Sequence, residues 1–431
     1  MGIINTKYGK IRGIETEDSC VYKAIPYAKP PVGVLRFRPP QAPDSWDDVR
    51  DCGKFPPMAI QKLETADSFY GKEFFSYPEF NVDMSEDCLY LNVWTPKDAN
   101  NCPVAIWYHG GGFQGGNGAE AEFDGAAFNR RGVILVTVNY RLGMLGFFCH
   151  PELREDGVSG NWGFRDQIAA LDWVRENITG FGGNPDNITI FGQSAGGMAV
   201  RELVCSPYIK GKIARAIMQS CNGHGGPLKV DFSMEKMERI SQKFLKRKKI
   251  SISELKELPA ESFINLQKDY NFFAGFRTRA GLSLTPVIDG KYIPVSPDQA
   301  IENGTTARIS YMVGSTKNDM TVTKAGAADA RKSKLHRSLL RLAGYHTAQG
   351  LPSYAYRFDR QLPGDRSGAF HSSELWYVFG TLDRSWRPME EADFILSEYM
   401  TDAWTQFMKT GSPGWEPCTG EAGYYQIFDI K

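Results

Sequence analysis

From residue 89 onward, short apolar runs alternate with segments whose apolar positions recur at helical spacing. The apolar runs cover 104–108, 133–138, 188–191, 216–218, 309–313 and 354–358. Between the second and third runs, apolar residues three or four positions apart predict a helix with one apolar face: Phe164, Ile168, Leu171, Val174 and Ile178. Continuous apolar strands that alternate with such helices predict a largely parallel sheet with helices on both faces. The predicted fold class is α/β.

The first hundred residues and two later segments have other patterns. Runs at 9–14 and 20–27 predict antiparallel edge strands. Residues 69–80 are predicted to form an aromatic-rich loop without clear periodicity, which fits either surface packing or a rim over an active site. Residues 231–271 are helical and polar. Residues 321–346 hold small residues and then a basic segment, which favours a solvated cap helix over a membrane-surface helix.

Length and composition narrow the class of protein. The 431 residues include 42% hydrophobic residues, and we expect one domain over 1–431 with cap insertions around 223–285 and 321–350. Lysine plus arginine and aspartate plus glutamate both number 50, so nucleic acid and an anionic membrane are not expected as partners. No apolar stretch is long enough for a transmembrane helix, and the N-terminus lacks a secretory pattern. The eight scattered cysteines contain no Cys-x-x-Cys pair, so we expect reduced thiols, no metal and a cytoplasmic location.

A Gly-x-Ser-x-Gly motif, residues 192–196, stands between a strand and a helix of this pattern. The run 187–191 precedes the motif, and the helical run 198–204 follows it. A serine at a sharp strand-to-helix turn forms a nucleophile elbow, in which its hydroxyl stands clear of the sheet. The alternative is an ordinary Gly-rich turn with a solvated serine. The flanking elements favour Ser194 as a nucleophile.

An acyl-transfer serine needs a base that takes its proton and an acid that holds the base, and on an elbow fold the acid and the histidine follow the serine. His371, after a predicted strand and a Gly-rich loop, is the candidate base. The other two late histidines are His336 and His346. His336 lies among basic residues, which disfavour it as a proton acceptor. Asp319, just past a predicted strand, is the candidate acid. Asp365 is the alternative, although it is more simply interpreted as a turn residue.

Oxyanion donors are predicted in the run His109-Gly110-Gly111-Gly112-Phe113, directly after the strand at 104–108. Successive glycines let backbone N–H groups approach a ligand oxygen without interference from side chains. The N–H of Ala195, next to Ser194, is a further donor. A phosphate-binding loop is the alternative, but no Gly-Lys-Ser/Thr follows the glycines.

These motifs resemble those of the type-B carboxylesterase (cholinesterase-like) family of α/β-hydrolases, in particular bacterial-type intracellular carboxylesterases. Further matching segments follow in order along nearly the whole chain: 30–37, 85–93, 139–143, 163–167, 219–220, 368–371 and 408–413. The resemblance implies an α/β-hydrolase fold with a mostly parallel central sheet, a small antiparallel N-terminal part and a shortened helical cap.

The resemblance also implies roles for individual residues. It implies a catalytic triad of Ser194, Asp319 and His371. It implies oxyanion-hole donors at Gly111, Gly112 and Ala195. It implies that Ser220 lies near the acid and the base, and that Arg36 with Glu86 and Arg141 with Asp166 form structural ion pairs.

The chain departs from the family at four places. Gln193 stands before the nucleophile where many relatives carry Glu, so a preference for cationic, choline-like alcohols is less expected. The acid is Asp319 rather than the commoner Glu. Cys88, a disulfide position in the family, has no evident partner. Only 52 positions separate Asp319 from His371, which predicts a trimmed cap and a more open pocket.

We therefore expect a serine carboxylesterase that hydrolyses small-molecule esters through an acyl-enzyme and needs no cofactor. An acyltransferase or amidase on the same triad is the alternative. A catalytically silent interaction protein, a class that the family also contains, lacks the nucleophile that is present here. Phe113, Trp162 and residues 69–80 are candidates for a substrate pocket that would accept an aryl ester, although packing explains them as well.

Overall fold

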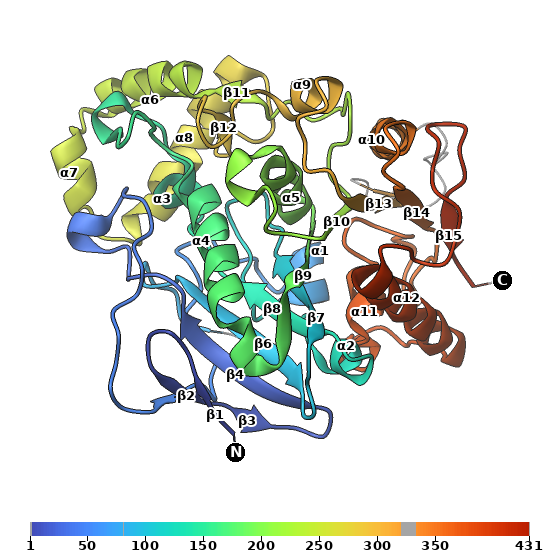
Figure 1. Ribbon diagram of the computed structural model, residues 1–431. Coiled ribbons are helices and arrows are strands. Elements are labelled where there is room, and N and C mark those ends of the chain that lie inside the picture. Colours follow the sequence, from blue (N-terminus) through green and yellow to red (C-terminus); the bar gives the residue numbers. More distant parts are fainter. Residues whose placement is uncertain (1, 81, 320–332, 431) are drawn as a thin grey trace.

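The computed structural model describes residues 2–80, 82–319 and 333–430, and its central feature is a ten-stranded sheet with helices on both faces (Figure 1). The strands are β1 Ile3–Asn5, β2 Lys10–Arg12, β3 Ile14–Glu15, β4 Ser19–Pro26, β5 Arg50–Asp51, β6 Tyr90–Pro96, β7 Cys102–Tyr108, β8 Ile134–Val138, β9 Gly183–Gln193, β10 Arg215–Gln219, β11 Phe232–Ser233, β12 Val287–Ile288, β13 Ser310–Thr316, β14 Tyr354–Phe358 and β15 Gln426–Phe428. The helices are α1 Phe69–Phe74, α2 Ala126–Arg130, α3 Gly143–Phe147, α4 Trp162–Asn177, α5 Ala195–Cys205, α6 Met234–Lys248, α7 Ile252–Glu257, α8 Ser262–Thr278, α9 Pro297–Glu302, α10 Lys334–Ala348, α11 Leu375–Phe379 and α12 Glu391–Thr410.

The strand order of the large sheet is β15-β14-β13-β10-β9-β7-β8-β6-β4-β3. The neighbours from β15 to β8 pair in parallel. The remaining pairs, β8 to β6, β6 to β4 and β4 to β3, are antiparallel. The structure therefore confirms the predicted α/β class, with a mostly parallel sheet and an antiparallel N-terminal part.

The central strands are apolar on both faces because both faces are covered. In β7, Ile106 packs into one core and Trp107 into the other, as successive side chains of a strand point to opposite faces. Helices α4, α5 and α10 cover the first face, and α2, α11 and α12 cover the second (Figure 1). This double burial explains the continuous apolar runs in the sequence.

Three local predictions need correction. The run 9–14 is divided between β2, in a small sheet with β1 and β5, and β3, at the edge of the large sheet. The chain must pass tightly at Gly13, where a Cβ atom would lie 2.3 Å from the carbonyl oxygen of Val21. Residues 69–80 contain the helix α1, capped by Ser68, whose hydroxyl accepts a hydrogen bond from the Gly71 N–H.

The third correction concerns the segment predicted as a solvated cap helix. Residues 320–332 lie outside the described residues. The following helix, α10, buries Leu339 and Ala343 against the sheet beside β13. That part of the prediction is wrong because the apolar positions of 334–348 form a face that packs on the sheet.

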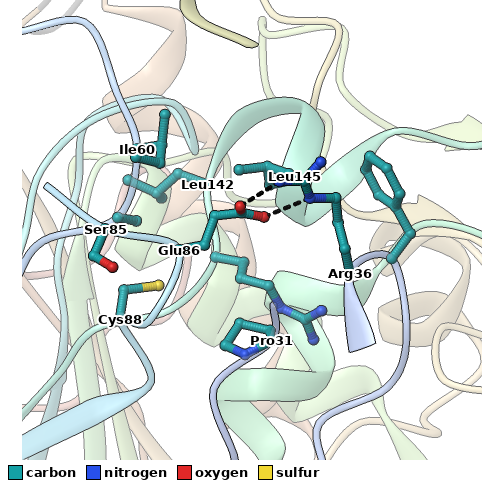
Figure 2. Close-up of a pocket in the computed structure, with 11 residues that line it drawn as sticks. Pro31, Arg36, Ile60, Ser85, Glu86, Cys88, Leu142 and Leu145 are labelled. Atoms are coloured by element: carbon teal, nitrogen blue, oxygen red, sulfur yellow. Dashed lines mark hydrogen bonds and ion pairs between the residues drawn. The ribbon is translucent and has the colours of Figure 1, made fainter. Parts of the chain in front are cut away.

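Both ion pairs that the resemblance implies are present. Arg36 contacts Glu86 through Nε at 2.7 Å and Nη2 at 2.5 Å (Figure 2). Arg141 and Asp166 are bidentate, with distances of 2.6 and 2.8 Å. Arg36 also lines a cavity of about 10 Å³, which is about the volume needed for one water and excludes a substrate.

Among the residues described, no helix combines the length and the apolarity needed to cross a bilayer.

Candidate active site

The predicted triad residues and the glycine run all follow strands of the parallel part of the sheet. Ser194 follows β9, Asp319 follows β13, and His371 lies in the segment between β14 and α11. The glycine run at 110–112 follows β7. The carboxyl ends of parallel strands lie at one edge of a sheet, and the topology brings these four segments together there.

Ser194 occupies a strained turn between β9 and α5. Its backbone has φ 57° and ψ −121°, an uncommon conformation for a residue with a side chain. The turn is held at both ends, because the Ser194 N–H donates to the Gln219 carbonyl at 2.9 Å and the Met198 N–H donates to the Ser194 carbonyl at 2.9 Å. Gly196 permits the close approach, since a Cβ atom there would lie 1.9 Å from the Tyr108 carbonyl oxygen. The local structure is that of the predicted nucleophile elbow.

His371 and Asp319 form a close pair. The distance from His371 Nδ1 to Asp319 Oδ1 is 2.5 Å, and the Asp319 side chain is only 2% exposed. The second carboxylate oxygen accepts a hydrogen bond from the Thr316 N–H at 3.3 Å. With one ring nitrogen facing the carboxylate, the other is left to accept a proton.

Two hydrogen bonds fix the acid segment against the base segment. The Asn318 N–H donates to the Ala369 carbonyl at 2.9 Å, and the Ala369 N–H donates to Asn318 Oδ1 at 3.0 Å. Asn318 is one residue before Asp319, and Ala369 is two residues before His371. The separation of acid and base is therefore set by backbone contacts as well as by their own side chains.

The electrostatic surroundings favour a protonated imidazole at His371. Burial by itself lowers the pKa of His371, but the charge of Asp319, its hydrogen bond and the nearby Glu374 together raise that pKa above the ordinary value. Burial and the charge of Asp319 raise the pKa of Glu374 to about 7. Gln193 Nε2 lies 3.3 Å from His371 Nε2, so this neutral residue contacts the base directly.

The glycine run forms a tight loop with free donors. Gly111 and Gly112 have φ of 91° and 64°, and a Cβ atom on Gly111 would lie 2.1 Å from the Gly115 carbonyl oxygen. Within the described part of the chain, the N–H groups of Gly111, Gly112 and Ala195 donate to no protein acceptor. An ideal Cβ on Gly110 would lie 3.3 Å from the Ser194 Cβ, so the loop lies against the serine. Such donors can stabilise an oxyanion.

A cavity of about 800 Å³ connects these groups. Its lining includes Gly110, Gly111, Gln193, Ser194 and His371. Aromatic side chains of the segment 69–80 line it too, and the Tyr70 hydroxyl donates to the His371 carbonyl at 3.4 Å. This segment also packs against the second core, with Phe69 against Phe370. Both interpretations of the aromatic segment therefore hold.

Two predicted pocket residues are misplaced. Phe113 is 1% exposed and packs on Phe147, and Trp162 is fully buried against Phe37. Neither lines the cavity. The prediction is wrong because nearness in the chain to the glycine run, or to a helix start, does not decide which side of an element faces the cavity.

The alternative triad members have other partners. Asp365 pairs with Arg387 at 3.0 Å. Burial by itself raises the pKa of Asp365, but hydrogen bonds from Arg387 and Ser367 outweigh burial and lower that pKa to about 2. His336 bonds Ser315 Oγ at 2.9 Å, and burial lowers its pKa to about 4. His346 contacts Thr306 Oγ1 at 3.2 Å.

Ser220, implied as a serine near the acid and the base, is buried after β10. Its N–H donates to the Gly314 carbonyl at 2.7 Å. Its hydroxyl has no hydrogen-bond partner among the residues that the structure describes.

Sequence reasoning missed part of the cavity wall. Gln114 Oε1 accepts a hydrogen bond from Gln267 Nε2 at 3.1 Å, which joins the glycine loop to α8. Glu120 and Glu122, eight and ten residues beyond the glycine run, also line the cavity. The available signal was two glutamates among small and apolar residues directly after an oxyanion loop.

Comparisons with known proteins agree on one family. A family model described as the carboxylesterase family matches residues 1–341 and 330–428. The chain is 35% identical to a para-nitrobenzyl esterase of Bacillus subtilis (strain 168), over 96% of this chain and 91% of that protein. It is 31% identical to a fumonisin B1 esterase of Sphingopyxis macrogoltabida, over 95% and 82% respectively. A solved PNB esterase structure superposes with a TM-score of 0.84 at 31% identity, covering 100% of this chain and 96% of that one.

Proposed function

This chain belongs to the carboxylesterase family and hydrolyses carboxylic esters, and we propose that it does so through an acyl-enzyme on Ser194. His371 is the general base in this proposal, and Asp319 holds the imidazole in place. Gly111, Gly112 and Ala195 supply the oxyanion donors. The substrate is a small-molecule ester, as it is for the named esterase relatives.

The first half of the reaction forms the acyl-enzyme. His371 Nε2 takes the proton of Ser194 Oγ as that oxygen attacks the ester carbonyl carbon. The carbonyl oxygen becomes an oxyanion, which the three backbone N–H groups stabilise. The carbon–oxygen bond to the alcohol then breaks, and the alcohol leaves with the proton held by His371.

The second half regenerates the serine. A water molecule gives a proton to His371 and attacks the acyl carbon, and the same donors stabilise the new oxyanion. When Ser194 Oγ leaves, it takes the proton back from His371, and the carboxylic acid is released. Asp319 stays ionised throughout and stabilises the imidazolium.

One observation carries the proposal: His371, whose Nδ1 lies 2.5 Å from Asp319, lines the same cavity as a serine in strained elbow geometry. A solvated Gly-rich turn has no reason to share a cavity with a histidine that is paired with a buried carboxylate. The N–H groups of Gly111 and Gly112, which donate to no acceptor among the described residues, support the same role.

The proposal extends to the architecture and the location of the protein. We propose a single domain in which the insertion at 223–285 caps the site, since α8 lines the cavity. Of the second expected cap, 321–350, the described part packs on the sheet. We also propose that the protein is located in the cytoplasm. Buried thiols such as Cys88, Cys149 and Cys221 would stay reduced there and serve as small apolar side chains.

Hydrolysis of 4-nitrophenyl acetate, butyrate and octanoate by the wild type and by Ser194→Ala tests the proposal. We expect the variant to lose on the order of a millionfold in kcat, because the nucleophile and its base act as a unit. Ser206→Ala, another serine that flanks α5, is the matched control and keeps wild-type activity. Equal rates for Ser194→Ala and a folded wild type would refute the acyl-enzyme. Adding methanol and analysing the products separates hydrolysis from acyl transfer.

A further inference from the structure

Two buried glutamates line the cavity that contains Ser194. Glu120 is 9% exposed and Glu122 is 2% exposed, and both lie between the glycine run and α2. Glu120 Oε1 accepts a hydrogen bond from the Asn117 N–H at 2.7 Å. Glu122 Oε2 is buried and has no hydrogen-bond partner among the described residues. A buried carboxylate oxygen without a partner is costly, and a donor group bound to the pair in the cavity wall would offset that cost.

No cation of the described chain neutralises this pair. Neither glutamate takes part in an ion pair with a described residue. Arg387 is engaged by Glu73 at 2.9 Å and by Asp365 at 3.0 Å. Arg384 donates to the Ala121 carbonyl at 3.0 Å, but its charge is matched by Asp124 at 2.6 Å.

The other ionisable groups that act on the pair bring no positive charge. Glu73 and Tyr77 face Glu122, and Tyr140 faces Glu120. His109, on the same loop, is neutral at pH 7 because burial lowers its pKa to about 4. Among the residues that the structure describes, the acidic pair therefore has no countercharge.

The two carboxyl groups hold protons more tightly than exposed ones do. Burial raises the pKa of Glu120 to about 7, and burial together with the charge of Glu120 raises the pKa of Glu122 well above the ordinary value. Above about pH 7 Glu120 is therefore ionised, and the pair carries negative charge. A hydroxyl group would supply a donor only, whereas a protonated amine would supply both a donor and the missing charge.

We propose that Glu120 and Glu122 form a recognition site for a protonated amine on the substrate, so that the enzyme favours esters carrying an ammonium group. This inference rests on the proposed function, because it places the amine of an ester whose carbonyl is at Ser194. Many relatives carry a glutamate at the position of Gln193, next to the nucleophile. Here Gln193 is neutral, and the negative charge in the cavity comes from Glu120 and Glu122 instead. The cavity of about 800 Å³ has room for both ends of such a substrate.

A binding experiment that needs no catalysis tests the site. The Ser194→Ala protein is titrated calorimetrically at pH 8 with n-hexylamine, which is protonated, and with 1-hexanol, which is neutral and of nearly the same shape. The titrations are repeated with Glu120→Gln and Glu122→Gln together in the same background. Glu64→Gln is the matched control, because Glu64 is an exposed carboxylate that lines the same cavity.

We expect hexylamine to bind about tenfold or more tightly than hexanol, as a hydrogen bond to a charged group contributes about 1.5–3 kcal/mol. The double variant should lose this preference, and Glu64→Gln should keep it. Equal affinities for the two probes, tighter binding of hexanol, or a preference that survives the double variant would overturn the proposal.

Two further readouts keep the proposal falsifiable if the double variant does not fold. Between pH 8 and pH 6 the preference of the Ser194→Ala protein for hexylamine should shrink, because Glu120, whose pKa burial raises to about 7, takes up a proton. A preference that is constant over this range contradicts the site. Hydrolysis of 4-nitrophenyl butyrate by the wild type is measured in parallel, so that a failure of the esterase proposal is seen separately from a failure of amine binding.

Discussion

Asp319 and the Glu120–Glu122 pair are buried acidic groups with different partners: Asp319 lies behind His371, which lines the cavity, whereas Glu120 and Glu122 line it themselves. Asp319 has a partner for each oxygen, His371 Nδ1 at 2.5 Å and the Thr316 N–H at 3.3 Å. Glu122 has a buried oxygen with no hydrogen-bond partner among the described residues, and Glu120 is bonded only to a backbone N–H and to Glu122.

The difference shows how partners decide what a buried carboxyl group does. Next to a histidine, the charge of Asp319 is used inside the protein, where it raises the pKa of His371. Without a cation, Glu120 and Glu122 hold protons more tightly, and their remaining charge is available to a ligand. We infer that one carboxylate serves the reaction and the other two serve recognition.

The largest effect on this comparison is expected from Asp319→Asn. The amide keeps the size of the side chain but removes the charge and favours the wrong imidazole tautomer. We expect kcat for 4-nitrophenyl butyrate to fall on the order of 10⁴-fold. Asp365→Asn is the matched control at the alternative acid, and it should keep kcat close to the wild-type value. A similar loss in both variants would remove the distinction between them.

The same variant should also change the pH profile. His371 must be neutral to accept the serine proton, so kcat/KM falls as the pH drops through the pKa of His371. Asp319 raises that pKa against the effect of burial, so Asp319→Asn should move the acid limb to lower pH. An unmoved limb would show that another group controls the profile.

A smaller effect is expected on stability. The pKa of Glu120 is raised from 4.5 to about 7 on folding, so the stability that this group contributes is present below about pH 4.5 and is lost as the pH rises through about 7. Glu120→Gln with Glu122→Gln removes this loss. Relative to the wild type, the free energy of unfolding should rise by on the order of 2–3 kcal/mol between pH 5 and pH 8.

Denaturant unfolding at the two pH values measures this change. Glu64→Gln, at an exposed carboxyl group, should show no such dependence. If the difference in unfolding free energy between the double variant and the wild type stays constant with pH, burial does not raise the pKa values of the pair.

The sequence predicted most strongly what a local pattern determines. The strand–turn–helix around Ser194, the glycine run and the alternation of apolar strands with helices are all local, and the structure has each of them. Ser194, Asp319 and His371 each come after a predicted strand. Because parallel strands end at one edge of the sheet, this placement was enough to predict that the three residues meet there.

What the sequence did not predict depends on side-chain direction across elements. Phe113 and Trp162 face the core rather than the cavity because Phe147 and Phe37 pack on them. Glu120 and Glu122 line the cavity together with side chains of the distant segment 69–80. Periodicity carries no information about such contacts between distant segments.

Covalent labelling tests the central claim most directly. The wild type and Ser194→Ala are treated with a fluorophosphonate ester, which phosphonylates an activated serine with release of fluoride, and the modified peptide is identified by mass spectrometry. We expect a single adduct on Ser194 in the wild type and none in Ser194→Ala. A folded wild type that remains unlabelled, or an adduct on a different residue, would contradict it.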